Sequence, residues 1–458
     1  MLLYSPNTLV DNEVNTNDVF RPINYLGSKL RILDFIEETV NRIDPGFGRV
    51  CDLFSGSGSV ALKLSKYRPV TAVDIQRYSG IICSALLSPV RIENKFLTDF
   101  IENATKSALY KKITVISEPL IAYEEKAITM ALINLNPENL CNVIENGSLR
   151  SYELTAAEMA KSEFFDLLKD VTQVLKSENL DNEKTLALRY FGGIYFSYKQ
   201  AIQIDALLEQ VENVPSKFRD TLMAAILSTV SECVNTVGKQ FAQPLRPRNL
   251  AGEIKPSLGK AANKDRSINL LATFVKWVNK YQQIPVSSQD HQVMNMDFEE
   301  ALNKLDKGTK VVYADPPYTR EHYSRFYHVL ETLSKRDLPT ISTMVAGGQK
   351  VLSRGLYRED RHQSPFCIRS QAPKAFESMF YKVSNIGAKL VLSYSPYDET
   401  KGSHPRVITI ERLVSLAKVY FALVEVVSAG HFIHSKLTHS KKHLEASETA
   451  EVLIICSN

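Results

Sequence analysis

The 458-residue chain has the composition of an ordinary globular protein, with 44% hydrophobic residues and a formal net charge of +4 from 55 basic and 51 acidic side chains. Because the two charges nearly balance, the net charge does not identify a nucleic-acid binder, and only local clusters of charge can decide that question. A chain of this length exceeds the size at which one hydrophobic core usually stops growing. We therefore expect a catalytic core with an inserted or appended domain.

Cysteine usage and hydropathy limit the class of protein further. The six cysteines are scattered without a pair at metal-ligand spacing, which argues against a zinc site and against a disulfide framework. No apolar run approaches the roughly 20 residues needed to cross a bilayer. The first 20 residues are acidic and Asn-rich, where a signal peptide would be basic and then apolar. We expect a soluble, cytoplasmic protein with no bound metal and no membrane partner.

The amino-terminal part of the chain has an α/β pattern. Residues 1–22 form a polar tail, and residues 23–43 contain a Gly-Ser-Lys turn before a helix with one apolar face. Residues 48–76 then read as a strand, a Gly-rich turn, a helix and a second strand that ends in an acidic residue. This order predicts a β-turn-α-β unit of the kind that binds nucleotides.

The pattern changes near residue 90 and returns near residue 286. Long helical patterns fill the intervening segment, and four further strands are predicted after it, within residues 307–318, 388–398, 419–433 and 448–456. We predict a Rossmann-like, doubly wound mixed sheet interrupted by a large, mainly helical inserted domain. The predicted parts are residues 1–90, 91–285 and 286–458.

The Gly-rich turn directly follows the first predicted strand, in the segment Asp52-Leu53-Phe54-Ser55-Gly56-Ser57-Gly58. Glycines let a ligand approach the backbone closely, and the helix that follows favours a negatively charged group. Asp74, at the end of the second strand, is placed to bind a ribose diol. The pattern favours a nucleoside-containing cofactor. A purely structural tight turn remains an open alternative.

A second motif, Asp315-Pro316-Pro317-Tyr318, directly follows a β-branched strand. The two prolines fix the backbone and remove two donors, so the strand ends and its carbonyls become fixed acceptors. A planar amine can donate both hydrogens to the Asp315 carboxylate and the Pro316 carbonyl, while Tyr318 stacks on the attached base. Two such acceptors would localise the amine lone pair as it attacks a sulfonium methyl. The alternative is a plain turn, since Asp and Pro are common in turns.

Five segments in this order resemble the motifs of the DNA adenine methylase family. They are residues 24–29, 52–60, 73–75, 296–298 and 315–318. The order resembles the class of that family whose target-recognition domain is inserted between the cofactor motifs and the catalytic motif. The resemblance covers about the first 90 and the last 170 residues, and the central portion matches only in position and size.

The resemblance implies S-adenosylmethionine as cofactor and a role for each matching residue. Lys29 and Tyr25 would hold the methionine carboxylate, and Asp315 and Tyr318 would hold a flipped adenine. The implied cofactor contacts along the methionine, ribose and adenine come from Asp52, Phe54, Gly56, Ser57, Gly58, Asp74, Ile75, Asp297 and Phe298. One departure is Gly27-Ser28-Lys29, where family members often carry Gly-Gly-Lys, and it leaves the role of Ser28 open.

Two basic clusters are candidates for contact with nucleic acid. The loop over residues 238–266 is rich in basic and poor in acidic residues, a pattern suited to phosphate contacts or to a merely solvated surface. A second cluster lies between the last two predicted strands. The candidate contact residues are Lys239, Arg246, Arg248, Lys260, Lys264, Arg266, Lys436 and Lys441.

Three segments remain open to two interpretations. The aromatic segment at residues 190–200 could fill the gap left by a flipped base or form the core of the inserted domain. Residues 320–325 could reach DNA or only cap a helix. Leu392-Ser393-Tyr394-Ser395 resembles a later family motif that walls the target-base pocket, although such a strand end is common in α/β sheets.

The function that these features favour is N6-adenine methylation of double-stranded DNA by a monomer, with a companion restriction endonuclease as a further partner. Alternatives with the same chemistry are transfer to cytosine N4 or to an RNA adenine. Alternatives of another class are a nicotinamide-dependent oxidoreductase, which leaves the proline motif unexplained, and a catalytically silent DNA-binding protein.

Overall fold

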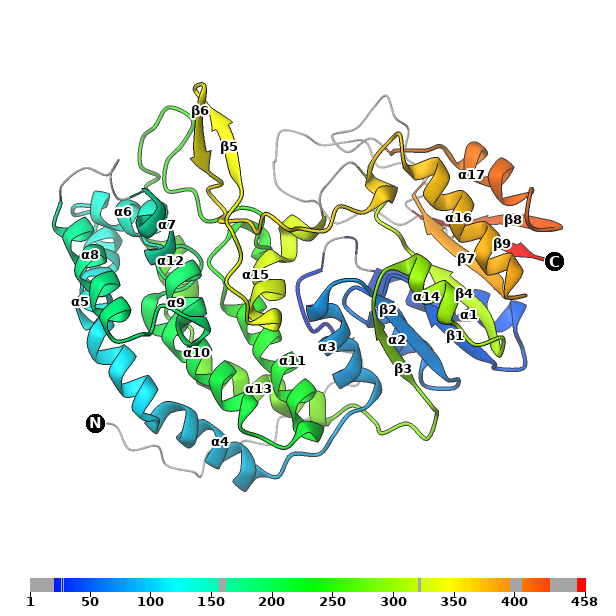
Figure 1. Cartoon of the computed structure of the whole chain (residues 1–458), viewed down its shortest axis with the longest axis horizontal. Helices are drawn as coiled ribbons and strands as arrows, with labels where there is room; N and C mark the ends of the chain where they lie inside the picture. Colours follow the sequence, from blue (N-terminus) through cyan, green and yellow to red (C-terminus); the bar gives the residue numbers. More distant parts are fainter. Residues whose placement is uncertain are drawn as a thin grey trace.

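The computed structural model describes residues 20–25, 27, 29–155, 162–319, 323–395, 406–428 and 451–458. These residues form an α/β core and a helical region that lie side by side (Figure 1). All six cysteines are buried and none forms a disulfide. Within the described ranges, no helix combines the length and the hydropathy that a bilayer span requires.

A seven-stranded mixed sheet forms the centre of the core, as the sequence predicts. Its strands are β1 (Arg49–Asp52), β2 (Val70–Asp74), β3 (Gln292–Asn295), β4 (Thr309–Ala314), β7 (Lys389–Tyr394), β8 (Leu423–Ser428) and β9 (Val452–Ser457). Their order is β3-β2-β1-β4-β7-β9-β8, and β9 runs antiparallel to both of its neighbours. The strand order reverses direction between β1 and β4, which is the point where doubly wound sheets bind their ligands.

Helices cover both faces of this sheet, and the alternation of side chains along its central strands explains why. Val50 and Val311 pack against one helical layer, whereas Cys51 and Val312, one residue on, pack against the other. A strand buried on both faces has to be apolar throughout, which accounts for the β-branched run in β4. The first layer contains α1 (Leu33–Ile43), α2 (Ser59–Leu64) and one side of α3 (Arg77–Leu87), and the second contains α14 (Phe298–Lys304), α16 (Ala372–Asn385) and α17 (Ile410–Ala417).

The helical region lies between α3 and β3 in the chain. One apolar cluster runs through it and continues onto α3 and α15 (Tyr323–Lys335), so the region is packed against the core. Polar side chains begin several of its helices, as with the Ser197 and Gln200 capping box. The helices are α4 (Asn94–Lys106), α5 (Ala108–Leu132), α6 (Glu138–Asn146), α7 (Leu149–Thr155), α8 (Glu163–Ser177), α9 (Leu186–Phe191), α10 (Tyr198–Glu212), α11 (Ser216–Cys233), α12 (Leu258–Arg266) and α13 (Leu270–Gln282).

The aromatic segment at residues 190–200 belongs to the core of the helical region. Tyr190, Phe191, Tyr195, Phe196 and Tyr198 are each no more than 1% exposed. The core interpretation of this segment is therefore confirmed, and its aromatic rings are not on the surface where they could fill a gap in DNA.

Two β elements were not predicted from the sequence. Strand β3 lies at the edge of the sheet and begins and ends in exposed polar residues, so it lacks the apolar run that marks the central strands. A separate hairpin, β5 (Thr343–Ala346) with β6 (Gln349–Leu352), follows α15 and pairs with no other strand. Because its side chains are largely exposed, the sequence there lacks the alternation of apolar and polar residues that predicts a strand.

Candidate functional site

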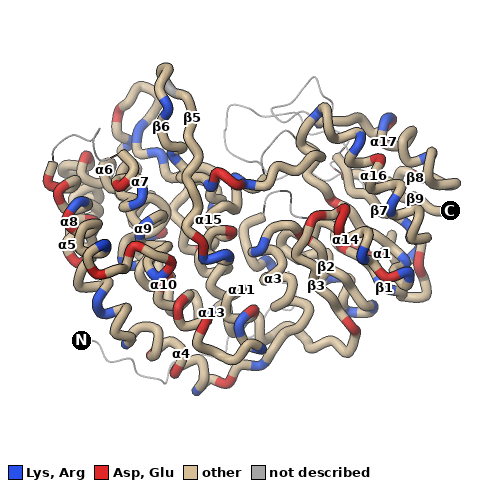
Figure 2. Tube along the Cα trace, in the orientation of Figure 1, with Lys and Arg blue, Asp and Glu red and all other residues tan. Residues whose placement is uncertain are grey.

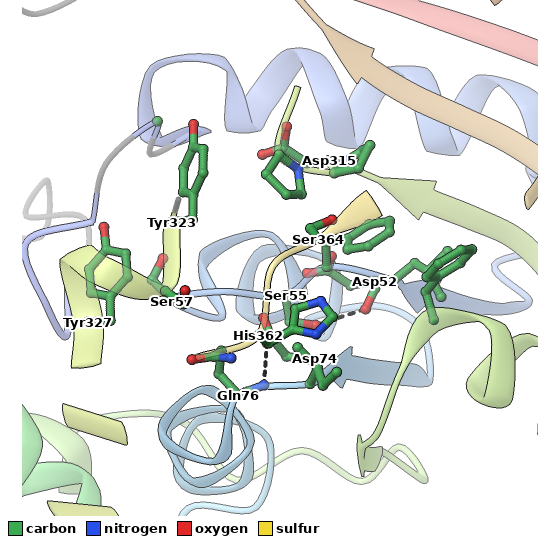
Figure 3. Close-up of a pocket in the computed structure, with 18 of the residues that line it drawn as sticks. Asp52, Ser55, Ser57, Asp74, Gln76, Asp315, Tyr323, Tyr327, His362 and Ser364 are labelled. Carbon is green, nitrogen blue, oxygen red and sulfur yellow. Dashed lines mark hydrogen bonds between the residues drawn. The ribbon is translucent and has the colours of Figure 1, made fainter. Parts of the chain in front are cut away.

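The two motifs meet at the carboxyl ends of adjacent strands. β1 and β4 are parallel neighbours with Asp52 opposite Tyr313, and the Leu53 N–H donates to the Tyr313 carbonyl at 2.9 Å. The Gly-rich turn after β1 and the proline motif after β4 therefore open onto one pocket (Figure 3), with about 1260 Å³ of space outside the protein atoms. The predicted convergence of the two motifs is confirmed.

The Gly-rich turn brings backbone close to the pocket because both of its glycines have left-handed backbone angles. Gly56 has a φ of 52° and Gly58 a φ of 72°. A Cβ at Gly56 would lie 2.6 Å from the Tyr25 ring, so any side chain there would fill the space beside that ring. Ser55 joins the turn to β1 and β2, because its hydroxyl donates to the Asp52 carbonyl and its N–H donates to the Val73 carbonyl.

Two carboxylates lie beneath this turn. Burial, together with the Asp315 and Asp74 charges, raises the pKa of Asp52 to about 8. Burial raises the pKa of Asp74 to about 6, although the N–H groups of Gln76 and Gly56 donate to it at 2.8 and 2.9 Å. Both oxygens of Asp52 are buried, and in the described structure no side chain donates to them, although the backbone N–H groups of Ala61 and Phe54 are close enough to oppose the rise of its pKa. Asp52 therefore offers a place for a cation or donor that a ligand would bring.

Aromatic side chains form one wall of the pocket. Phe54 contacts Phe298 at a ring separation of 5.9 Å, and both rings contact Phe366. Beside the Gly-rich turn, Tyr25 stacks on Tyr327 with ring centroids 4.9 Å apart. This combination of flat apolar walls with a few buried polar groups suits a nucleoside.

The catalytic motif turns away from the sheet at Asp315. One carboxylate oxygen, Oδ2, lies 2.8 Å from the Lys29 ammonium. Burial raises the pKa of Asp315 to about 6, an effect that Lys29 opposes and Glu451 reinforces. Among the described residues, nothing donates to Asp315 Oδ1 or to the Pro316 carbonyl, and both residues line the pocket. Two acceptors are thus available to a planar amine.

Lys29 lies between two carboxylates rather than in an open part of the pocket. Its Nζ is 2.8 Å from Asp315 and 3.4 Å from Glu451, and its side chain is 8% exposed. Burial alone would lower the pKa of Lys29, but the two carboxylates raise it well above the usual value. The structure therefore places this ammonium on the Asp315 carboxylate, whereas the resemblance implied contact with a methionine carboxylate.

Glu451 organises the back of the catalytic motif. Its Oε1 accepts from the Ser393 hydroxyl at 2.8 Å and from the Tyr318 hydroxyl at 3.4 Å, in addition to its pairing with Lys29. The Tyr318 ring also contacts Tyr394 at 4.9 Å and lies 4.9 Å from the Arg406 guanidinium. The Ser393-Tyr394 segment thus contacts the catalytic motif from the neighbouring strand.

Most of the predicted site residues line this pocket. The four residues of the catalytic motif do so, together with Tyr25, Lys29, Asp52, Phe54, Ser57, Asp74, Ile75, Asp297 and Phe298. Gly56 and Gly58 shape the turn behind the lining residues. Asp297 also begins α14, because its carboxylate accepts from the Glu299 N–H at 2.9 Å.

Further residues of this site were not predicted. Glu451 precedes an antiparallel strand at the far end of the chain, and no local pattern marks it. Tyr323 follows the catalytic motif closely and was considered only for DNA contact or capping, whereas the structure places it in the pocket wall. The pocket is also lined by His362, Gln363 and Ser364, which come from the loop after the hairpin. These residues are close to the two motifs in the folded structure but not in the sequence.

The predicted DNA contacts are dispersed, and the structure pairs three of them with acidic residues, one of them inside the protein. Arg266 is buried and pairs with Glu124, and Lys239 pairs with Asp265 at 2.7 Å. Arg248 pairs with Glu138 and Glu145. Only Arg246, Lys260 and Lys264 of this group are exposed. Lys436 and Lys441, with Arg320 and His322, lie outside the described residues.

Comparisons with known proteins agree with the site. The model of the D12 class N6 adenine-specific DNA methyltransferase family matches residues 25–126 and 274–345, which include both the cofactor and the catalytic motifs. The chain is 23% identical over 442 residues to the Modification methylase LlaI of Lactococcus lactis subsp. lactis, covering 94% of this chain and 54% of that protein. It is 24% identical over 374 residues to the Type II methyltransferase M.FokI of Planomicrobium okeanokoites, covering 81% of this chain and 44% of that protein.

The chain thus spans about half the length of the curated relatives it matches. Three observations are consistent with one another across that span. They are the strand order, the two motifs that meet at the ends of β1 and β4, and the match to the family model. Over residues 25–126 and 274–345 the chain is thus similar to the D12 class of N6 adenine-specific DNA methyltransferases.

Proposed function

We propose that the protein transfers a methyl group from S-adenosylmethionine to the N6 amine of an adenine flipped out of double-stranded DNA. The observation that carries this proposal is the common pocket of Asp315 and the Gly-rich turn. An adenine inside a duplex cannot reach such a pocket, so base flipping follows from the geometry. Because the two relatives are named a modification methylase and a type II methyltransferase, we extend the proposal to a monomer that acts beside a companion restriction endonuclease.

The residues at the Gly-rich turn fit this cofactor. Asp52 has two buried oxygens to which no side chain donates in the described structure, and these suit the ammonium of the methionine part. Glycine at position 56 lets the Tyr25 ring pack directly against the turn, because a Cβ there would lie 2.6 Å from that ring. The Asp74 carboxylate would accept from the ribose hydroxyls, and Phe298 with Ile75 and Asp297 would flank the adenine ring. When bound, S-adenosylmethionine supplies an electrophilic methyl group on a sulfonium sulfur.

Asp315 and Pro316 would activate the target amine. An adenine amine is a poor nucleophile because its lone pair is delocalised into the ring. Hydrogen bonds from its two protons to Asp315 and to the Pro316 carbonyl favour a pyramidal nitrogen whose lone pair is available for attack, and this stabilisation grows in the transition state. Asp315 can then take the proton that the product amine loses. Tyr318 would lie against the base.

Lys29 would hold Asp315 in its charged form and in the required orientation. The ammonium binds Oδ2 of Asp315, which leaves Oδ1 available to the amine. Glu451 shares the same ammonium, so Lys29 remains paired if Asp315 moves toward the base. If Asp315 were its only partner, the buried Lys29 ammonium would be left without a carboxylate to neutralise it in that step.

We further propose that the core, residues 1–90 and 286–458, carries out the chemistry, and that residues 91–285 recognise the target sequence. This division is supported by the position of the helical region, which packs onto the core through α3 and α15, two helices whose residues line the pocket.

The experiment that tests this function follows labelled methyl groups into DNA. Purified protein is incubated with S-adenosylmethionine carrying a labelled methyl group and with duplex DNA of mixed sequence, and the DNA is digested to nucleosides. We expect the label in N6-methyladenine nucleoside alone. Label in N4-methylcytosine, label only when RNA is supplied, or no label at all would contradict the proposal.

The Asp315→Ala variant connects the activity to the pocket. Removing one of the two acceptors should lower kcat by at least about 10³-fold, because such groups act mainly in the transition state. Cofactor binding, measured by calorimetry, should change little. Asp306→Ala is a matched control, because Asp306 is exposed and precedes the opposite end of β4. Equal losses in both variants would show that the effect is not specific to the pocket.

A further inference from the structure

The hairpin β5–β6 projects away from the helices and the sheet (Figure 1). Its strands pair from Thr343 opposite Leu352 to Ala346 opposite Gln349, and Gly347-Gly348 form the loop. Both glycines have positive φ angles, 57° and 81°, as two-residue hairpin loops of type I′ require. A Cβ added at either glycine would meet nothing within 4 Å, so the described structure leaves the tip uncovered.

Apolar side chains are exposed near this tip. Met344 is 52% exposed, Val345 71% and Val351 37%. A hairpin of two strands is barely stable on its own in water, and a projecting group of apolar side chains usually marks a contact site. The tip therefore has the form of an element that is completed by a partner.

The foot of the hairpin, in contrast, is firmly held. Ser353 N–H donates to the Ser342 carbonyl at 2.9 Å, and Ser342 N–H donates to the Tyr357 carbonyl at 2.7 Å, so the ladder continues below the named strands. The buried Tyr195 hydroxyl lies 2.8 Å from the Gly355 carbonyl and 2.7 Å from the Phe241 carbonyl. The tip is thus carried on a rigid stem that is anchored to the helical region.

The charge of this segment is positive. Residues 338–358 contain no Asp or Glu, and Figure 2 shows Lys and Arg positions on the hairpin and beside its foot. Arg358 is neutralised internally, because it pairs with Asp337 and Asp360. Lys350 and Arg354 have no carboxylate within ion-pair distance in the part of the chain that the structure describes.

Three arginines gather at the foot, and none of them has an ion pair with a described carboxylate. Arg354 donates to the Leu245 carbonyl at 2.9 Å, next to Arg246, and the Arg361 guanidinium lies 4.9 Å from the centre of the Tyr357 ring. Burial raises the pKa of Tyr357, and the nearby charges of Arg325, Arg361, Arg246 and Arg354 oppose that rise. Arg361 Nε and Nη1 are buried without a hydrogen-bond partner in the described structure. Glu145 and Asp360 act on Arg354 and Arg361 only at a distance, so this arginine group can still bind an anion that comes from outside the chain.

One member of this group, Arg361, borders the pocket. Arg358 and Arg361 line a second cavity, which shares Ile75, Gln76 and Ser324 with the main pocket. His362, the residue after Arg361, lines both cavities. An anion bound at Arg361 would therefore lie beside the main pocket.

We propose that Arg246, Arg354 and Arg361 bind backbone phosphates of duplex DNA, while the β5–β6 tip enters a groove of that DNA beside the base to be flipped. A guanidinium matches phosphate geometry, and the major groove admits a two-stranded ribbon. Apolar side chains at such a tip can also wedge between base steps and help to unstack a base. The proposal rests on the proposed function and names a surface that delivers its substrate.

Two variants and one control test the surface. The first replaces the three arginines with Gln. The second deletes residues 345, 346, 349 and 350, which shortens the hairpin by two paired positions. Pairs two apart along an antiparallel ladder are equivalent, so Met344 and Val351 can flank the same Gly-Gly loop. The control replaces three exposed lysines of the α/β core domain with Gln and so removes the same amount of charge. These lysines are Lys66, Lys307 and Lys418.

The measurement is the affinity for a short fluorescent duplex of mixed sequence, taken from about 50 to 200 mM salt. Each lost phosphate contact should reduce the slope of log affinity against log salt by about 0.9, so the triple arginine variant should lose about 2 to 3. The shortened hairpin should bind about tenfold more weakly and lose at most the contribution of Lys350 from the slope. Cofactor binding should be unchanged in all three variants, which verifies that they fold.

The outcomes separate this inference from the proposed function. A wild-type slope in the triple arginine variant, or an equal loss in the lysine control, would overturn the phosphate contacts. Wild-type affinity in the shortened hairpin would overturn the role of the tip. If the wild-type protein binds duplex DNA with a steep slope that needs these arginines yet methylates no base, the surface stands and the proposed function fails.

Discussion

The pocket and the basic segment at residues 238–266 were both selected from the sequence, yet they differ in what the structure does with their charges. In the pocket, Asp52, Asp74 and Asp315 are brought together by strand ends and line one space. In the basic segment, Arg266 and Lys239 turn inward and pair with acidic residues of the helical region. A cluster of like charges in a sequence is therefore a weaker indication of a site than charges placed at adjacent strand ends.

The difference has a physical origin. Parallel strands end at a common edge, so a residue directly after a strand has a position fixed by the backbone. Residues 238–266 were expected to form a flexible loop, but residues 258–266 form helix α12, and Arg266 at its end is buried beside an acid instead of being exposed to DNA. Arg246, which stays exposed, obtains its proposed role from its neighbours Arg354 and Arg361 rather than from the segment in which it was found.

The largest effect that can break this comparison is expected from Arg266→Ala. Glu124, which is 2% exposed, would remain buried without its cationic partner, and the free energy of unfolding should fall by about 3 to 5 kcal/mol. Burial raises the pKa of Glu124 and Arg266 opposes that rise, so the loss should be larger at pH 8 than at pH 5. Urea denaturation at the two pH values measures both effects.

Lys264→Ala, on the same helix, is the matched control, because its side chain is exposed. It should leave stability nearly unchanged. If Arg266→Ala proved as stable as Lys264→Ala but reduced the salt dependence of DNA binding, Arg266 would be a DNA contact after all and the comparison would fail.

A smaller effect is expected within the pocket from Glu451→Gln. The substitution keeps the shape and the contacts with Ser393 and Tyr318 but removes one of the two charges on Lys29. Lys29 should then bind Asp315 more tightly and compete with the target amine, so kcat should fall by about 10-fold to 100-fold, in line with the loss of one supporting group. The KM for S-adenosylmethionine should change little.

The pH profile distinguishes this role from a structural one. The Glu451 charge helps to raise the pKa of Asp315, which is about 6. Activity requires ionised Asp315 and so rises with pH through that value. In Glu451→Gln the midpoint of this rise should move to lower pH, and Glu451→Asp should restore it in part. An unshifted midpoint would contradict the assignment of Glu451 as a positioning residue.

The sequence alone predicted those parts of the site whose positions depend on the backbone preferences of neighbouring residues in the chain. Glycines and prolines directly after apolar strands fixed the positions of Gly56 and Asp315, because each residue type permits or forbids particular backbone angles there. The partner of Lys29 could not be inferred in this way, because Asp315 and Glu451 reach it only through the packing of β4 and β9. The burial of Arg266 likewise depends on Glu124, which lies 142 positions away in the chain.

The smallest effect concerns the pH dependence of cofactor affinity. Burial raises the pKa of Asp52 to about 8, far above the ordinary value for an aspartate. Its ionisation in the folded protein is therefore unfavourable, so the stability it contributes at low pH is lost as pH rises toward 8. An ammonium bound at Asp52 would reverse this preference. Affinity for S-adenosylmethionine should thus rise from pH 6 to about 8, by at most about tenfold per pH unit, and fall as the cofactor amine deprotonates at higher pH.

Calorimetric titrations across this range with the wild type and Asp52→Asn test the argument. Asp74 also titrates in the range, with a pKa of about 6, so the wild-type curve alone contains both contributions. The variant retains Asp74 and should bind more weakly, with a shallow dependence between pH 7 and 8. If its curve instead parallels that of the wild type over this interval, the ammonium does not lie on Asp52, and the buried carboxylate belongs to the support of the Gly-rich turn.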